Sequence, residues 1–157
     1  MMVKPLGNGV FTAILWWRNL EVNIYLYSCH NITKDLASEV RMRGASPELP
    51  LALIPHNLVS SPLEILQGAI HYALYSHKIK RIRNRGLALA LLITGIRQLE
   101  KLVSALEEEL KRGTSYYVVG VNTDLRNKDC CAPLENLDTS RMPQRLAKNI
   151  ELLFSLL

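Results

Sequence analysis

Two short apolar stretches near the beginning of the chain are typical of β-strands. Residues 10–16 (VFTAILW) and 22–27 (VNIYLY) are rich in β-branched and aromatic side chains, which favour extended backbone. Asn19 lies in the polar break between them. We therefore expect two neighbouring strands, paired as a hairpin.

Residues 61–76 carry the clearest helical pattern. Ser61 suits the N-cap, Pro62 suits the first helical position, and Glu64 follows three residues after the cap, where its carboxylate can bond back to the Ser61 amide. Apolar residues then recur at spacings of three and four and predict a buried face, consisting of Leu66, Ala69, Ile70, Ala73 and Leu74.

The same kinds of pattern predict the remaining elements. Periodic apolar positions indicate four more helices, at residues 31–43, 87–93, 94–112 and 143–157. Strand-forming residues predict two further strands, at 51–54 with an extension through 58–59, and at 116–121. Residues 122–140 are expected to form a polar loop. The last helix, residues 143–157, is apolar on nearly all sides and so needs cover from the core or from a partner protein.

Composition limits the possibilities only broadly. A chain of 157 residues is long enough for one domain with a sizeable core, so we expect a single domain over residues 1–157. Aromatic residues make up 6% of the chain, which argues against a broad base-stacking surface. The formal net charge of +5 suggests anionic partners, although it also fits a protein that is merely soluble.

The cysteines and the hydropathy pattern suggest a cytoplasmic protein. The three cysteines are odd in number and two of them, Cys130 and Cys131, are adjacent, so we expect reduced thiols and no disulfide framework. No stretch reaches the roughly 18–20 uncharged apolar residues of a membrane span. The first residues do not resemble a signal peptide, and we expect no contact with a membrane.

Motifs of catalysis and metal binding are missing from the sequence. It contains no phosphate-binding G-x-x-x-x-G-K-[ST] or G-x-G-x-x-G, no zinc-binding H-E-x-x-H and no G-x-S-x-G. The four histidines are scattered, and the only two on one predicted helix, His71 and His77, are six residues apart and do not share a face. We therefore expect no catalytic residue, no metal and no cofactor.

A cationic run at residues 78–85 is the most informative feature. It holds five Lys or Arg residues within eight positions and is followed by an apolar segment, a Thr94-Gly95 break and Arg97-Gln98. If a helix begins at that break, its unpaired N–H groups and its dipole favour a phosphate or carboxylate. The candidate nucleic-acid-binding residues are Lys80, Arg81, Arg83, Arg85, Thr94, Gly95, Arg97 and Gln98.

Simpler explanations exist for both parts of this region. The cationic run also fits a solvated turn between helices. Arg97 also fits a surface residue in a first helical turn, with Gly95 as N-cap and Gln98 as a capping side chain.

The order of elements in residues 61–106 resembles the small kinase-binding subunit of the KEOPS complex, the PRPK-binding-protein family. The segment SPLEILQGAIHYAL has Ala69 and Ala73 at the alanine positions of that family. A basic linker then leads into a Leu-rich helix, and TGIRQLEKLVSAL is similar to the archaeal pattern S-G-x-R-Q-I followed by a helix. The chain departs from the pattern at Ala88, Ile65 and Thr94, where Glu, His and Ser are usual.

The resemblance implies a fold and a function. The fold would be α+β, with a small central mixed β-sheet flanked by several α-helices. The protein would be a non-catalytic subunit that binds and activates the small atypical protein kinase/ATPase of the complex, which makes threonylcarbamoyladenosine in tRNA. Archaeal relatives also bind the single-stranded 3′ end of tRNA, which agrees with the cationic run.

For the kinase we expect a docking face on the last helix, formed by Leu146, Ile150, Leu153 and Phe154. Two alternatives remain open from the sequence. One is a small protein that binds an anionic ligand, and the other is a purely structural scaffold subunit without nucleic-acid binding.

Overall fold

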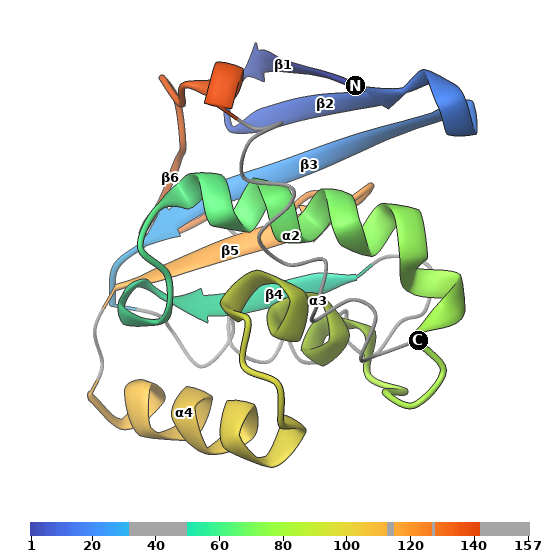
Figure 1. Cartoon of the computed structure of the whole chain (residues 1–157). Coiled ribbons are helices and arrows are strands. Elements are labelled where there is room, and N and C mark those ends of the chain that lie inside the picture. The colour runs from blue at the N-terminus through green and yellow to red at the C-terminus, as the bar shows by residue number, and fades with distance from the viewer. Residues whose placement is uncertain (32–49, 113–114, 127, 142–157) are drawn as a thin grey trace.

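A six-stranded antiparallel sheet forms the centre of the computed structural model, which describes residues 1–31, 50–112, 115–126 and 128–141 (Figure 1). Five strands follow the order β1-β2-β3-β5-β4, and β6 pairs with β3 outside this path. The strands are β1 (Met2–Gly7), β2 (Val10–Leu15), β3 (Leu20–Cys29), β4 (Leu51–Pro55), β5 (Tyr116–Val121) and β6 (Cys131–Pro133).

Strand β3 organises the sheet because it is long enough to pair with three partners. It has ten residues, of which Ile24–Cys29 pair with β5 on one side. On the other side the first part of β3 pairs with β2, and Tyr27–Cys29 pairs with the short β6. Every pairing among the described strands is antiparallel, so the sheet is not mixed as the family resemblance implied.

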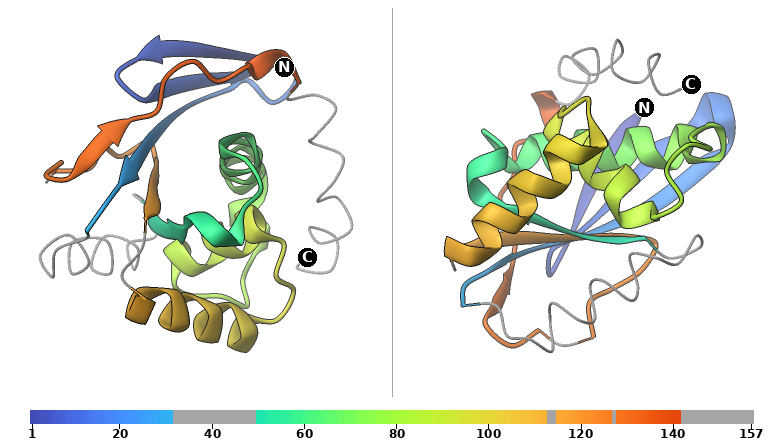
Figure 2. Two further views of the ribbon diagram at one scale, coloured as in Figure 1. Left: turned by 90° about the vertical axis from the view of Figure 1, so that its left-hand side faces the viewer. Right: turned by 90° about the horizontal axis from the view of Figure 1, so that it is seen from below.

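Three helices lie on one side of this sheet, namely α2 (Pro62–Tyr75), α3 (Arg85–Thr94) and α4 (Leu99–Arg112) (Figure 2). The main core lies between the inner face of the sheet and α2 and α3, with Ile24, Leu66 and Leu89 completely buried. Helices α2 and α3 approach closely at Gly68, where an added Cβ would lie 2.7 Å from the Ile93 Cα. A small residue is therefore required at that crossing. The structure confirms a single α+β domain in which one sheet packs against helices.

Most of the expected elements are present. The hairpin is confirmed as β2 and β3, and helices α2 and α3 and strands β4 and β5 lie where the sequence patterns place them. The Ser61 hydroxyl caps α2 by accepting a hydrogen bond from the Leu63 amide, as expected, whereas the Glu64 carboxylate accepts from the Ser60 amide and not from Ser61. The expected extension of β4 is wrong, since His56–Leu58 forms a 3₁₀ turn.

Two strands were not expected at all, β1 and the short β6 within the supposed polar loop. The helices expected at 31–43 and 143–157 fall outside the described residues, apart from Asn31. Within the part that the structure describes, no helix is long and apolar enough to cross a membrane.

Candidate nucleic-acid interface

The cationic run forms the loop between α2 and α3, and three of its residues anchor it to the core. Ile79 and Ile82 are buried, with 1% and 6% of their surface exposed. The Arg85 guanidinium donates hydrogen bonds to the carbonyl oxygens of Ser76 (3.0 Å), Ile79 (2.7 Å) and Ile82 (2.7 Å). Two buried apolar side chains and one guanidinium group thus fix the loop backbone, which reduces its freedom to move.

This anchoring separates the predicted cations into two groups. Arg85 is half-buried and its guanidinium is engaged by backbone carbonyls, so it has the structural role of shaping the loop. Burial raises the pKa of the nearby Tyr72 hydroxyl, and the positive charge of Arg85 opposes that shift. The remaining cations of the loop are exposed on its outer side and comprise Lys78, Lys80, Arg81 and Arg83.

One signal in the sequence distinguishes Arg85 from its neighbours, namely that it directly follows Asn84, a residue type that often caps helices. Asn84 is the N-cap of α3, because its side chain accepts a hydrogen bond from the Leu87 amide. Arg85 is therefore the first residue of the helix, where a positive charge is unfavourable to the dipole. An arginine at that position needs compensating acceptors, and the loop carbonyls provide them.

The Thr94–Gln98 turn differs from the helix start expected for it. Gly95 ends α3, with a left-handed φ of +74° and an amide that donates to the Leu91 carbonyl at 3.0 Å. The Thr94 hydroxyl donates to the Ala90 carbonyl at 2.9 Å and accepts from the Ile96 amide at 3.3 Å. The expectation that Gly95 is the N-cap of the next helix is therefore wrong, because a left-handed glycine after a helix satisfies the last carbonyls of that helix.

Helix α4 begins later than expected. Its first residue is Leu99, and the Gln98 carbonyl accepts the first bond of the helix, from the Leu102 amide at 3.0 Å. Arg97 and Gln98 are exposed immediately before this start, whereas Glu100 adds an exposed negative charge in the first turn. A phosphate at this helix start would be repelled by Glu100, so the 76–84 loop is the more favourable anion site of the two.

Both segments lie on the helical side of the sheet (Figures 1 and 2). The two segments that carry the exposed predicted residues therefore lie on the same side of the sheet, and these residues are Lys80, Arg81, Arg83, Arg97 and Gln98. Thr94 and Gly95 belong to the end of α3, and Arg85 to the inside of the loop. The expected kinase-docking residues at positions 146–154 lie outside the described residues.

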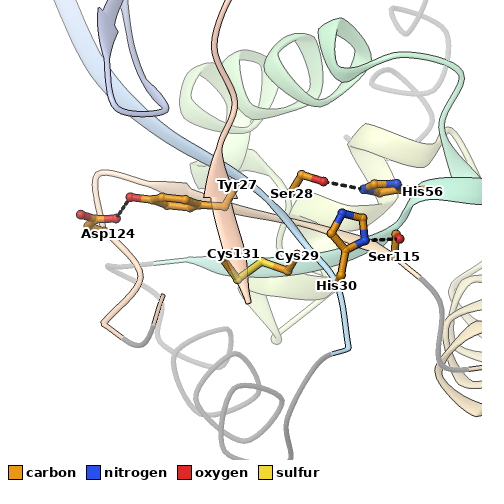
Figure 3. The surroundings of a disulfide bond; sticks show 8 residues. All are labelled: Tyr27, Ser28, Cys29, His30, His56, Ser115, Asp124 and Cys131. Atoms are coloured by element: carbon orange, nitrogen blue, oxygen red, sulfur yellow. Dashed lines mark hydrogen bonds between the residues drawn. A yellow bond between two sulfur atoms is a disulfide. The ribbon is translucent and has the colours of Figure 1, made fainter. Parts of the chain in front are cut away.

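A second polar cluster, which the sequence did not predict, lies where β3 and β4 end and β5 begins (Figure 3). Ser28 Oγ lies 3.2 Å from His56 Nε2, and His30 Nδ1 lies 2.6 Å from Ser115 Oγ. The His56 ring stacks on Tyr117, with centroids 3.9 Å apart. Burial, and next the charge of His30, lower the pKa of His56, while a hydrogen bond to the Tyr116 backbone opposes the shift.

This cluster has a clear structural role. The two Ser–His contacts join β3 to the turn after β4 and to the residue before β5, at the point where the strand ladders end. An imidazole beside a hydroxyl is also the pairing found in an activated serine, in which a third group orients the imidazole. In the described ranges, no group of three or more His, Cys, Asp or Glu side chains is placed to hold a metal ion.

The cysteines contradict the expectation of reduced thiols. Cys29 and Cys131 face each other in the β3–β6 pairing, with Cα atoms 4.0 Å apart, and form a disulfide (Figure 3). Cys130 is an exposed free thiol. The two bonded residues are separated by 102 positions, so only the pairing of β3 with β6 could reveal their proximity.

Charged groups lie beside this disulfide. The Tyr27 hydroxyl donates to the Asp124 carboxylate, and the Lys128 ammonium lies 5.4 Å from the Tyr27 ring centroid and 3.0 Å from an Asp124 oxygen. Burial raises the pKa of Asp124, but the hydrogen bonds from Tyr27 and Lys128 outweigh it and lower the pKa overall.

Comparisons with models of known families, with curated proteins and with solved structures find no match to this chain. The family resemblance therefore rests on the sequence of residues 61–106.

Proposed function

We propose that this protein is a non-catalytic subunit that binds the single-stranded 3′ end of tRNA through the exposed cations of the 76–84 loop, assisted by Arg97 and Gln98. The observation that carries the proposal is that some residues of the loop anchor its backbone while its other cations are exposed. Ile79, Ile82 and Arg85 hold the backbone from inside. The other cations, Lys78, Lys80, Arg81 and Arg83, are exposed on the backbone that these contacts hold.

Such an arrangement suits a phosphate backbone. When exposed, closely spaced Lys and Arg side chains neutralise phosphates, they displace the counterions condensed on the nucleic acid, which makes the affinity depend on salt. A loop that is already ordered loses less conformational freedom on binding than a flexible one. The exposed loop cations alone provide up to four phosphate contacts, from Lys78, Lys80, Arg81 and Arg83.

The wider role that we propose follows the family resemblance. The protein would act in the cytoplasm within the KEOPS complex, where it binds and activates the small protein kinase/ATPase during threonylcarbamoyladenosine synthesis. A disulfide such as Cys29–Cys131 is unusual in most cytoplasms but is common in the intracellular proteins of hyperthermophilic archaea.

The test is a fluorescence-polarisation titration with whole tRNA and with tRNA that lacks its 3′ single strand, at about 50 and about 200 mM salt. We expect trimming to abolish most of the binding. In the Arg81→Ala/Arg83→Ala variant we expect binding to weaken by about tenfold or more at the lower salt. Its salt-dependence slope should fall by about 1.4, because each phosphate contact with a single strand contributes about 0.7.

The matched control is Lys4→Ala/Lys111→Ala, which removes the same charge from exposed positions on β1 and at the end of α4. Equal losses in both double variants would mean that net charge alone attracts the tRNA, and would refute a specific site on the loop. Binding that does not depend on the 3′ end would refute the substrate. No tRNA binding at all would favour the scaffold or the small anionic-ligand alternative.

A further inference from the structure

Two exposed tryptophans form the tip of the β2–β3 hairpin. Trp16 and Trp17 are 63% and 56% exposed and lie in a 3₁₀ turn, Trp16–Arg18, which Asn19 ends in a left-handed conformation. Their ring centroids are 5.9 Å apart and the rings are nearly perpendicular. Tryptophan usually buries most of its large apolar surface, so two exposed neighbours point to a ligand.

The position of this turn connects it to the cationic loop. The β2–β3 turn and the 76–84 loop lie at the same end of the molecule, with the C-terminal end of α2 between them (Figures 1 and 2). Arg18, in the same turn as the tryptophans, and His77 and Lys78, directly after α2, are also exposed. This end of the protein therefore combines exposed indole rings with the cationic side chains of Arg18 and Lys78.

Aromatic rings beside cations are the combination by which proteins bind single-stranded nucleic acid. Cations follow the phosphates, and bases stack on the aromatic faces regardless of their sequence. An edge-to-face pair such as Trp16 and Trp17 leaves ring faces open for a base. A partner protein that buried the same rings would have to match the neighbouring cations with acidic groups, whereas RNA supplies both the bases and the negative charge.

We infer that Trp16 and Trp17 form a stacking site for unpaired bases of a single-stranded RNA whose phosphates lie along the 76–84 loop. This inference rests on the proposed function for the class of ligand, but it adds a contact at a different element. It also revises the expectation from composition, because the few aromatic residues include two that are concentrated at one exposed tip.

Intrinsic fluorescence provides a direct readout, since these are the two tryptophans of the chain. We would titrate the protein with tRNA, with a single-stranded oligoadenylate and with an abasic oligomer of equal length, which keeps the phosphates and lacks the bases. We expect tRNA and oligoadenylate to quench the tryptophan emission and the abasic oligomer to bind more weakly with little quenching.

Variants separate stacking from charge. We expect Trp16→Ala/Trp17→Ala to weaken binding by about tenfold with an unchanged salt slope, since stacking involves no counterion release. Trp16→Tyr/Trp17→Tyr should retain most of the affinity, because tyrosine also stacks. Leu6→Ala is the control, since Leu6 is an apolar residue 61% exposed on the outer strand β1. Urea denaturation of each variant checks that it is folded.

The outcomes distinguish this inference from the proposed function. RNA binding with unchanged emission and unaffected Trp variants would overturn the stacking site and leave the cationic loop as the RNA site. Equal binding of the abasic oligomer would overturn it in the same way. Failure of every RNA to bind would overturn both, and would leave the tryptophans as a contact for a protein.

Discussion

Replacing Arg85 tests the claim that one cation of the run builds the site and does not contact the ligand. In Arg85→Ala the carbonyls of Ser76, Ile79 and Ile82 lose their shared donor. A hydrogen bond to a charged group contributes about 1.5–3 kcal/mol. The three bonds share one guanidinium, and carbonyls of a surface loop can regain water, so the contributions do not add fully. We expect the free energy of unfolding to fall by about 2–4 kcal/mol.

The substitution Arg85→Lys sharpens the test. A lysine ammonium is a compact charge on a flexible stem, whereas the planar guanidinium has donors in a fixed fork. Lysine can therefore replace only part of the three-carbonyl geometry, and we expect a stability between those of the wild type and Arg85→Ala. If the positive charge alone mattered, Arg85→Lys would be as stable as the wild type.

Arg83→Ala is the matched control, because Arg83 is exposed and lies two positions before Arg85. Urea denaturation monitored by circular dichroism should show a change within about 0.5 kcal/mol for Arg83→Ala, as for most surface substitutions. In the tRNA titration, under conditions where both variants are folded, Arg83→Ala should weaken binding more than Arg85→Ala does. The salt-dependence slope should also be lower for Arg83→Ala. Similar stabilities of Arg85→Ala and Arg83→Ala would refute the anchoring role.

Two further predictions concern the end of β3. Reduction of Cys29–Cys131 should lower the free energy of unfolding by up to about 4.7 kcal/mol, the loop-entropy value for a closed loop of 102 residues. Added reductant should not destabilise Cys29→Ala further. Burial lowers the pKa of His56 below its usual 6.5, so the folded state binds the proton more weakly than the unfolded chain. The stability that His56 contributes is therefore complete above pH 6.5 and is lost as the pH falls through the folded-state pKa. Urea denaturation at pH 7.5 and 5.5 should show a steeper fall for the wild type than for His56→Gln, and parallel falls would contradict this assignment.

Local patterns in the sequence were sufficient for elements whose own residues determine their conformation. Helix α2 has its Ser61 cap, Pro62 at its first position and an apolar stripe, and these features act within one or two turns. The β2–β3 hairpin likewise depends on neighbouring strand-forming residues and a short connection. The concentration of cations at residues 78–85 is also a property of the sequence alone.

Contacts between distant segments decided the rest. Strand β1 carries Pro5 and Gly7, which weaken any strand signal, and it becomes a strand because β2 offers an edge to pair with. Strand β6 and the Cys29–Cys131 disulfide can form because β3 extends beyond its pairing with β2, which leaves Tyr27–Cys29 free to pair with β6. Pairing between residues about a hundred positions apart produces no periodic pattern in the sequence of either segment, so local patterns could not predict it.

The surroundings of each charged side chain were likewise decided by the tertiary structure. Arg83 and Arg85 belong to the same cationic run, but only the fold brings three carbonyls around Arg85 and leaves Arg83 in solvent. Gly95 could start one helix or end another, and its left-handed φ settles that it ends α3. The sequence by itself determined which cations the chain offers, and the tertiary structure decided which of them are exposed, because that choice depends on acceptors and buried volume supplied by other parts of the chain.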